Sequence, residues 1–198
     1  EECEMTFGPD KNGGKGTAVE LSLDNGEKVY LCGKIDRIDI AKDEKDEQKG
    51  YLRIIDYKSG EKKLDLTKIA NGIQIQLPIY MKAAKDKYSE VQPAGMFYYT
   101  LKDKIINKEN PTKNSTQEKD EGMVLHGMYI EEPEVLQKLE RDMGQKSTVI
   151  NLSKYPSGKI YRNNEKLSRD NFEKVIQMAV DSATEAVKRL NKGDISIN

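Results

Sequence analysis

The chain contains 198 residues, which is enough for one domain with a substantial hydrophobic core. Hydrophobic residues make up 36% of it and charged residues 34%, and the charges nearly balance, to a formal net charge of −1. Composition alone therefore gives no case for a nucleic-acid-binding protein, although a basic groove can be hidden within a balanced total. The sequence has no run of about 18 apolar residues, which excludes a membrane-spanning helix.

The start of the chain and its cysteines bear on its origin. It opens with EECEMTFGPDK, which has neither an initiator methionine nor the basic, apolar and small-residue segments of a signal peptide. We therefore expect a piece cut from a larger cytoplasmic protein. Cys3 and Cys32 are too few for a disulfide framework and are expected to be reduced thiols. The single histidine, His126, is expected to be structural or at the surface rather than a ligand or a base.

The first forty residues predict antiparallel strands. Residues 18–23 and 28–32 alternate between apolar and polar side chains, and the Asn-Gly pair between them is a strong hairpin signal. The second strand is expected to continue through Ile35 to Ile40. A charged, solvated connection over residues 42–50 then leads to the next strand, at residues 51–57.

From residue 66 to residue 87 the apolar period becomes that of a helix. The predicted inner face of this helix consists of Ile69, Ile73, Gln76, Tyr80 and Ala84. Pro78 lies inside the pattern and predicts a kink or a break just before it. Gln92-Pro93 is expected to close the region, before a strand at residues 95–101.

The second half of the chain begins with a polar segment. Residues 102–122 lack aromatic side chains and are expected to form a mobile loop, a long insertion in the domain. A shorter helix is predicted over residues 133–143. Ser157-Gly158 then marks a turn in a region of short strands.

The last helix has the clearest pattern. Ser168 or Asp170 can cap its start, with Glu173 completing a capping box on Asp170, and Gly193 ends it. Its apolar stripe consists of Phe172, Val175, Ile176, Ala179, Val180, Ala183, Val187 and Leu190. The order of elements predicts a single α/β domain, a mixed sheet with helices packed on it. Its core would span about residues 17–101, with a C-terminal helix at residues 168–192.

Two acidic residues occur at matching places in two neighbouring predicted strands. If Ile40 faces Leu52 across an antiparallel pairing, the same register makes Asp36 face Asp56. Side chains alternate along a strand, so all four residues share one face of the sheet. Directly opposed residues have Cβ atoms about 4.5–5.5 Å apart, and the two carboxylates would therefore lie side by side.

A divalent cation would remove the repulsion between these carboxylates, because Mg²⁺ and Mn²⁺ prefer hard oxygen ligands. The next facing pair of the same register is Lys34 and Lys58. Lys58 would then hold a phosphate oxygen or orient an attacking water, an arrangement that suits phosphodiester hydrolysis. The alternative is a solvated hairpin end, where the two lysines neutralise Asp36 and Asp56 through diagonal salt bridges.

Other polar residues accompany this set. Asp39 falls on the opposite face with Arg37 and Arg53, which we interpret as a surface ion pair of about 0–1 kcal/mol. A bulge would reverse the two faces, so Asp39 is the reserve candidate for the site. On the predicted helix, Gln76 and Tyr80 are four residues apart and therefore neighbours. Gln76 is either half-exposed at the helix edge or a polar clamp near the metal or the nucleic acid.

Three motifs in a fixed order make the chain resemble a known family. They are GKIDRID at residues 33–39, LRIIDYKSG at residues 52–60 and GIQIQLPIY at residues 72–80. Together they resemble the RecB-like branch of the PD-(D/E)xK nucleases, and most closely the nuclease domains of AddB-type subunits of bacterial helicase–nucleases. Similar segments follow at residues 93–99, 122–127 and 192–195. The resemblance implies a restriction-endonuclease-like fold, a mixed central sheet flanked by helices, over residues 1–198.

The resemblance also implies roles for the matching residues. Asp36 and Asp56, with the backbone carbonyl of Tyr57, would bind Mg²⁺ or Mn²⁺. Lys58, rather than Lys34, would be the catalytic lysine.

Further consequences of the resemblance concern substrate and partner. Gln76 and Tyr80 match a Gln-x-x-x-Tyr motif of this branch, which implies contacts with the substrate. The implied activity is Mg²⁺-dependent exonucleolytic cleavage of DNA, at single-stranded ends, during double-strand-break repair and recombination. The implied partner is an AddA-type helicase–nuclease subunit.

Two expectations of the family lie outside this chain. A further metal ligand, often histidine, is expected upstream, and an iron–sulfur cluster is expected on cysteines that neither Cys3 nor Cys32 matches. A fragment without these groups could be inactive. Two alternatives stay open at this point. One is a non-catalytic module that binds DNA or a partner through the same fold, and the other is a stand-alone RecB-like or CRISPR-associated exonuclease.

Overall fold

The computed structural model describes residues 2–12, 14–42, 50–101, 124–161, 163 and 165–194. The strands of this part of the chain are β1 Glu2–Phe7, β2 Val19–Ser22, β3 Lys28–Leu31, β4 Gly33–Lys42, β5 Gly50–Lys58, β6 Val91–Thr100, β7 His126–Ile130 and β8 Lys166–Leu167. Its helices are α1 Leu66–Ala70, α2 Gln76–Lys87, α4 Pro133–Leu139 and α5 Arg169–Asn191. The mobile loop expected over residues 102–122 lies outside the described residues.

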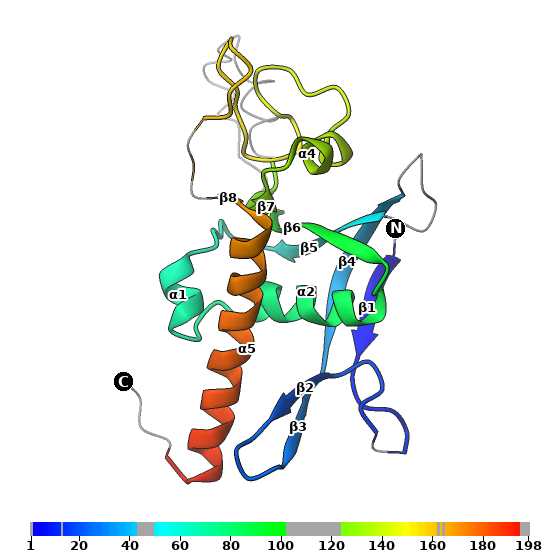
Figure 1. The fold of residues 1–198 in the computed structure, drawn as a ribbon, viewed down its shortest axis with the longest axis vertical. Helices are drawn as coiled ribbons and strands as arrows, with labels where there is room; N and C mark the ends of the chain where they lie inside the picture. Colours follow the sequence, from blue (N-terminus) through cyan, green and yellow to red (C-terminus); the bar gives the residue numbers. More distant parts are fainter. Residues whose placement is uncertain are drawn as a thin grey trace, which may run out of the picture.

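The central sheet is mixed and has six strands, in the order β1-β4-β5-β6-β7-β8 (Figure 1). β5 pairs in parallel with β6, and β7 with β8, whereas β1, β4 and β5 are antiparallel neighbours. The parallel β5–β6 pair is joined by a crossover through α1 and α2, as parallel pairing requires. The predicted α/β class is therefore confirmed, although β1, the strand that pairs with β4, was not predicted as a separate element.

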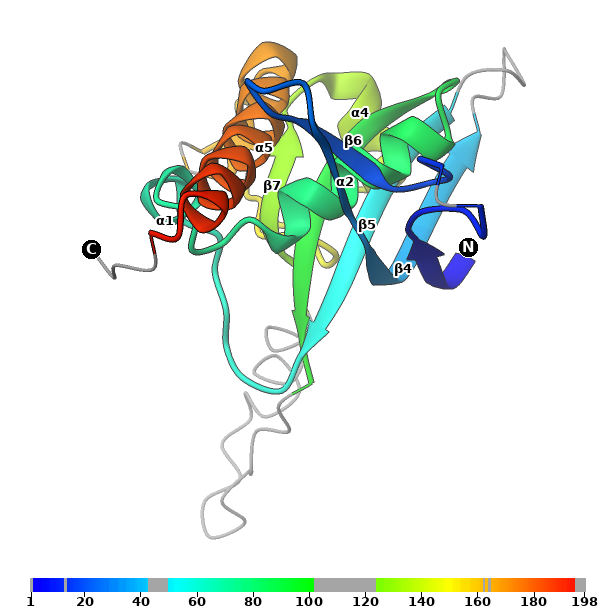
Figure 2. The same cartoon turned by 90° about the horizontal axis from the view of Figure 1, so that it is seen from below.

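Helices cover both faces of the central sheet. Lys58 on β5 hydrogen-bonds Gln76 of α2, whereas Arg53 on the same strand lines a cavity with Leu139 of α4. Residues five apart in a strand point to opposite faces, so α2 and α4 lie on opposite sides of the sheet. Figure 2 shows this arrangement, with α5 on the same side as α2.

The core fills the space between the sheet and these helices. Ile38, Leu52 and Ile54, at the centre of the sheet, have no exposed surface, and neither has Phe172 of α5. Burying a side chain of this size stabilises the fold by about 1.5–3 kcal/mol. None of the described helices is long and apolar enough to cross a membrane.

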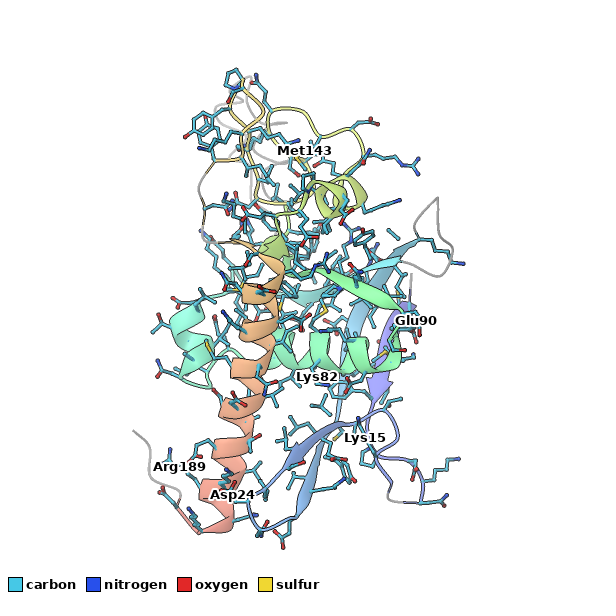
Figure 3. The ribbon with its side chains drawn as sticks, in the orientation of Figure 1. Lys15, Asp24, Lys82, Glu90, Met143 and Arg189 are labelled. Carbon is cyan, nitrogen blue, oxygen red and sulfur yellow. The ribbon has the colours of Figure 1, made fainter. Side chains whose placement is uncertain are left out.

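The predicted hairpin at the start of the chain is present as a separate two-stranded sheet, β2–β3. Gly26 adopts φ +81° in the turn, as the Asn-Gly signal requires. Cys32 separates β3 from β4, so the strand that was expected to continue changes sheet at this residue. Asp24 at the hairpin tip accepts a 2.8 Å hydrogen bond from Lys188, which ties the hairpin to α5. Figure 3 shows Asp24 close to the end of α5 that carries Arg189.

The predicted helix over residues 66–87 is broken into α1 and α2, which confirms the expected break before Pro78. Gly72 adopts φ +73° just after α1, a conformation that ends helices. Pro78 is the third residue of α2, where its missing N–H has no partner to lose. The expected inner position of Ile73 was wrong, because this side chain falls in the break and is 71% exposed.

Strand β6 starts earlier than predicted, so Gln92-Pro93 lies inside a strand instead of closing the helical region. Pro93 pairs with Leu52, immediately before a register shift between Leu52 and Arg53. The pairing of β6 with β7 begins only at Gly95. Proline is tolerated here because one of its sides has no ladder and a bulge follows on the other.

The end of the predicted helix at residues 133–143 also differs, because α4 stops at Leu139. Glu140 has extended backbone dihedrals, and its carboxylate accepts hydrogen bonds from Ser147 and Thr148. These contacts hold the chain away from the helical path. The predicted turn at Ser157-Gly158 is confirmed, with Gly158 at φ +82°.

The start of α5 confirms one prediction and corrects another. Ser168 is the N-cap, and its hydroxyl accepts a 3.3 Å hydrogen bond from the N–H of Asn171. The capping box between Asp170 and Glu173 was wrong, because Glu173 pairs with Lys85 of α2 at 2.5 Å. This long-range ion pair joins the two helices on one face of the sheet.

Candidate active site

The pairing of β4 with β5 has the predicted register. Ile38 faces Ile54 and Ile40 faces Leu52, and the pairs run without a shift from Lys42–Gly50 to Arg37–Ile55. A slip of one residue would turn these isoleucines toward solvent, so burial of the apolar side chains specifies the register. The bulge that would have exchanged the two faces is absent from this pairing.

Asp36 and Asp56 come together where the β4–β5 ladder ends. Asp36 is half-buried, and its Oδ2 atom accepts a 3.0 Å hydrogen bond from the backbone N–H of Tyr57. This contact fixes the Asp36 carboxylate beside the end of β5. The two acidic residues predicted to share a face are therefore neighbours.

The Asp56 carboxylate is buried, with only 2% of the residue exposed. Its Oδ2 atom lies 2.5 Å from Nζ of Lys58 as an ion pair but receives no well-directed hydrogen bond. Burial raises the pKa of Asp56 above its ordinary value of 3.8, Lys58 opposes this effect, and the neighbouring charge of Asp36 adds to it. A buried carboxylate oxygen without a directed donor still has free coordination capacity.

A hydrogen-bonded chain extends from Lys58 into α2. Nζ of Lys58 donates a 3.1 Å hydrogen bond to Oε1 of Gln76, and Nε2 of Gln76 donates a 2.9 Å bond to the Tyr80 hydroxyl. The Tyr80 ring packs edge-on against Phe7 of β1, at 5.8 Å between centroids. Of the two readings for Gln76, the geometry corresponds to a polar clamp, and the clamp acts on the lysine.

Two other predicted candidates lie apart from this group. Nζ of Lys34 pairs with Glu4 of β1 at 2.9 Å rather than with either aspartate of the pair. Asp39 lies on the opposite face, where it accepts hydrogen bonds of 2.8 Å from Arg37 and 2.9 Å from Arg53. Burial raises the pKa of Asp39, but the bonds from both arginines outweigh burial and leave this pKa below 3.8.

Tyr98 and Gln74 are part of the surroundings of the site but were not predicted. Tyr98 pairs with Asp56 in the β5–β6 ladder, and burial raises the pKa of its hydroxyl to about 12. Gln74 accepts a hydrogen bond from the N–H of Asp65 and donates one to the carbonyl of Lys63, which fixes the loop after β5. Alternation along β6 could have identified Tyr98, whereas nothing local distinguishes Gln74 from Gln76.

His126 and the cysteines stand outside the chemistry of the site. His126 faces Tyr98 across the β6–β7 ladder, and its Nδ1 atom lies 3.5 Å from Oε1 of Glu165. Cys3 and Cys32 form no disulfide, and both are exposed.

The two carboxylates fit a divalent cation. Within the described part of the chain, no three histidine, cysteine, aspartate or glutamate side chains gather into a metal-binding cluster. Asp36 and Asp56 thus provide a pair of carboxylates, and the buried Oδ2 atom of Asp56 is the group that most needs an additional partner. A hard cation would meet that need, because carboxylate oxygens are its preferred ligands.

Sequence comparison identifies the family. The model of the PD-(D/E)XK nuclease superfamily matches residues 2–196, nearly the whole chain. The chain belongs to this superfamily. Its mixed sheet with flanking helices is the restriction-endonuclease-like fold that such nucleases share, as the resemblance implied.

Curated relatives of this nuclease chain share one name, that of the B-type subunit of an ATP-dependent helicase/deoxyribonuclease. The protein from Alkaliphilus oremlandii is 31% identical over 90% of this chain, and the one from Clostridium acetobutylicum is 31% identical over 98%. A third, from Caldanaerobacter subterraneus, is 30% identical over 98% of the chain. The matched segment makes up only 16–17% of each relative.

Proposed function

We propose that this nuclease domain hydrolyses phosphodiester bonds of DNA with the help of a divalent cation. The observation that carries the proposal is the meeting of Asp36, Asp56 and Lys58 at the end of one strand pairing without a register shift. In a chain with 34 acidic and 33 basic residues, such a triplet has little weight by spacing alone. Burial of Asp56 next to a second carboxylate gives it weight, because that arrangement is costly without a ligand.

Asp36 and Asp56 would hold the cation, Mg²⁺ or Mn²⁺, with the backbone carbonyl of Tyr57 as a further oxygen ligand. When bound, the cation would polarise the phosphoryl group and offset the negative charge that develops on it. The Asp56 carboxylate would then stay ionised despite its burial, because a cation nearby favours the charged form.

Lys58 would contact a phosphate oxygen or orient the attacking water. Gln76 supports this role, because its amide oxygen holds the ammonium by a 3.1 Å hydrogen bond without neutralising its charge. Tyr80 in turn holds the amide of Gln76 and would also lie beside the substrate. Both side chains come from α2, which begins at Gln76, so the position of one helix sets the position of the lysine.

The biological setting follows from the relatives. We infer that the chain is the nuclease domain of an AddB-type subunit, acting in the cytoplasm with an AddA-type partner on single-stranded DNA ends. It would work as an exonuclease in double-strand-break repair and recombination. The name of the relatives, which describes part of a deoxyribonuclease, supports DNA as the substrate.

The decisive experiment is calorimetric titration of the chain with Mn²⁺. Asp56→Ala is expected to abolish binding, because it removes the buried ligand oxygens. Asp39→Ala is the matched control, since it removes a carboxylate from the same pair of strands but from the opposite face. Equal losses of affinity in both variants would contradict the assignment of the site to the Asp56 face, and binding that survives in Asp56→Ala would contradict the ligand set.

A further inference from the structure

A short hairpin after α4 presents two tyrosine rings to solvent. Tyr155 and Tyr161 are 43% and 41% exposed, and their rings stack on each other at 3.7 Å between centroids and 28° between planes. Each ring covers only one face of the other. The pair therefore offers flat aromatic surface that the fold itself does not use.

The hairpin holds this pair in a preformed geometry. The N–H of Tyr161 donates to the carbonyl of Ser153, and the N–H of Tyr155 donates to the carbonyl of Lys159. The turn between them is closed by a 2.8 Å bond from the N–H of Gly158 to the carbonyl of Tyr155. Because the backbone is fixed in this way, a ligand that stacks on the rings would lose little conformational entropy of the protein.

An open groove of about 830 Å³ extends from the hairpin toward the loop that leaves the catalytic strand. Tyr155 and Lys159 line it at the hairpin, Lys166 lines it on β8, and Leu66 lines it at the start of α1. The segment between Lys58 and Leu66 connects this groove directly to the end of β5. The same segment carries Lys62, whose Nζ lies 5.4 Å from the centre of the Tyr98 ring.

The groove and the carboxylates are also linked across the sheet. Asp56 pairs with Tyr98, and Tyr98 pairs with His126 on the next strand. His126 approaches Glu165, the residue before Lys166. A row of adjacent strands thus leads from the carboxylate pair to the wall of the groove.

We propose that the stacked Tyr155–Tyr161 pair is a binding platform for the bases of single-stranded DNA. Bases stack on exposed aromatic rings whatever their sequence, and ammonium groups along the same groove contact the phosphates. Lys159 is exposed beside the rings and supplies such a charge, and Lys62 supplies another next to Tyr98. The platform would guide a strand toward Asp56, and in this sense the inference rests on the proposed function.

The chain contains no tryptophan, so a single substitution can report on the platform. Tyr155→Trp keeps an aromatic ring in the stack and makes its indole the sole tryptophan fluorophore. Titration with a thymidine oligonucleotide of about 12 nucleotides, in EDTA to prevent cleavage, is expected to quench this emission by stacking. Tyr30→Trp, on the β2–β3 hairpin at the other end of the molecule in Figure 1, is the control whose emission is expected to stay unchanged.

Affinity measurements complete the test. Tyr155→Ala and Tyr161→Ala are each expected to weaken binding of the oligonucleotide about tenfold, whereas Tyr155→Phe is expected to retain the affinity. Lys159→Ala is expected to weaken binding and to reduce the salt dependence of its affinity. Thermal melting confirms that each variant is folded.

Two outcomes would overturn the platform. One is an unquenched indole in Tyr155→Trp while the oligonucleotide binds, and the other is unchanged affinity in both alanine variants. Binding of Mn²⁺ by Tyr155→Ala separates this proposal from the proposed function. Intact Mn²⁺ binding with lost oligonucleotide binding supports the platform, whereas loss of Mn²⁺ binding on Asp56→Ala concerns only the carboxylate site.

Discussion

Nζ of Lys58 donates a 3.1 Å hydrogen bond to Oε1 of Gln76, a residue 18 positions further along the chain. The bond joins the last residue of β5 to the first residue of α2. A neutral amide orients the ammonium but leaves its charge available. This relationship gives the first prediction, because it makes Gln76 a positioning residue for the reaction rather than a ligand of the cation.

Gln76→Leu is expected to lower the rate of cleavage of a labelled single-stranded oligonucleotide by about 10–100-fold, the usual effect of losing a partner that orients an active-site group. The affinity for Mn²⁺, measured by calorimetry, is expected to be unchanged because Gln76 touches neither carboxylate. Gln177→Leu is the control, since Gln177 is an exposed glutamine on α5 that bonds only Asp181 within its own helix. A parallel loss of cleavage and metal affinity would contradict the positioning role.

Asp56→Asn is expected to stabilise the chain in EDTA at pH 7, by about 0.5–2 kcal/mol, as substitutions of strained functional groups often do. The raised pKa means that the native state holds a proton on Asp56 more tightly than the unfolded state does. The free energy of unfolding of the original chain therefore falls as the pH rises from 3.8 through the raised pKa. Urea unfolding at several pH values is expected to show the difference from Asp56→Asn opening over this window.

Addition of Mn²⁺ should reverse that order. Only the chain with Asp56 gains the free energy of binding, which is about 2.7 kcal/mol when the free cation is at 100 times its dissociation constant. If Mn²⁺ stabilised both forms equally, the carboxylate of Asp56 would not be a ligand.

Asp39→Ala is expected to destabilise the chain by about 1–3 kcal/mol at pH 7, because it removes the shared partner of Arg37 and Arg53. The pKa of Asp39 lies below its ordinary value in the folded chain, so its ionised form contributes stability above pH 3.8. That contribution is lost as the pH falls through the lowered pKa. Urea unfolding curves of the two proteins should therefore converge in acid, and a constant difference at all pH values would contradict the ion-pair explanation.

Gly127→Ala is expected to destabilise the fold by at least about 2 kcal/mol. A Cβ atom at this position would lie 2.0 Å from the carbonyl oxygen of Met96 and 2.8 Å from the Cα atom of Phe97, and neither backbone atom can move freely inside the sheet. Gly144→Ala is the control, since a Cβ there meets nothing within 4 Å. Thermal melting of both variants is the measurement, and equal melting temperatures would contradict the close approach of β6 and β7.

Much of the site could be predicted from local patterns. Alternation of apolar residues in β4 and β5 specifies their register, because Ile38 and Ile54 must share the buried face. Once that register is set, Asp36 and Asp56 follow two residues further on the same face. The spacing of Gln76 and Tyr80 likewise needs only the period of a helix.

Other features could not be predicted because their energies come from distant parts of the chain. Glu173 has the right spacing for a capping box with Asp170, yet it pairs with Lys85, 88 residues away. Ile73 fits the apolar stripe, but a glycine in the left-handed conformation turns the chain before this side chain reaches the core.

Residue order and periodicity thus suffice to place two aspartates on one face of a hairpin and to mark the family motifs, because strand alternation and helical period are local properties. Which lysine approaches Asp56 depends on the folded chain, since Lys34 is drawn to Glu4 on β1 whereas Lys58 reaches Gln76 on α2. The burial that raises the pKa of Asp56 is likewise absent from its immediate sequence. Desolvation depends on every atom packed around a group, and those atoms come from strands and helices that meet only when the domain folds.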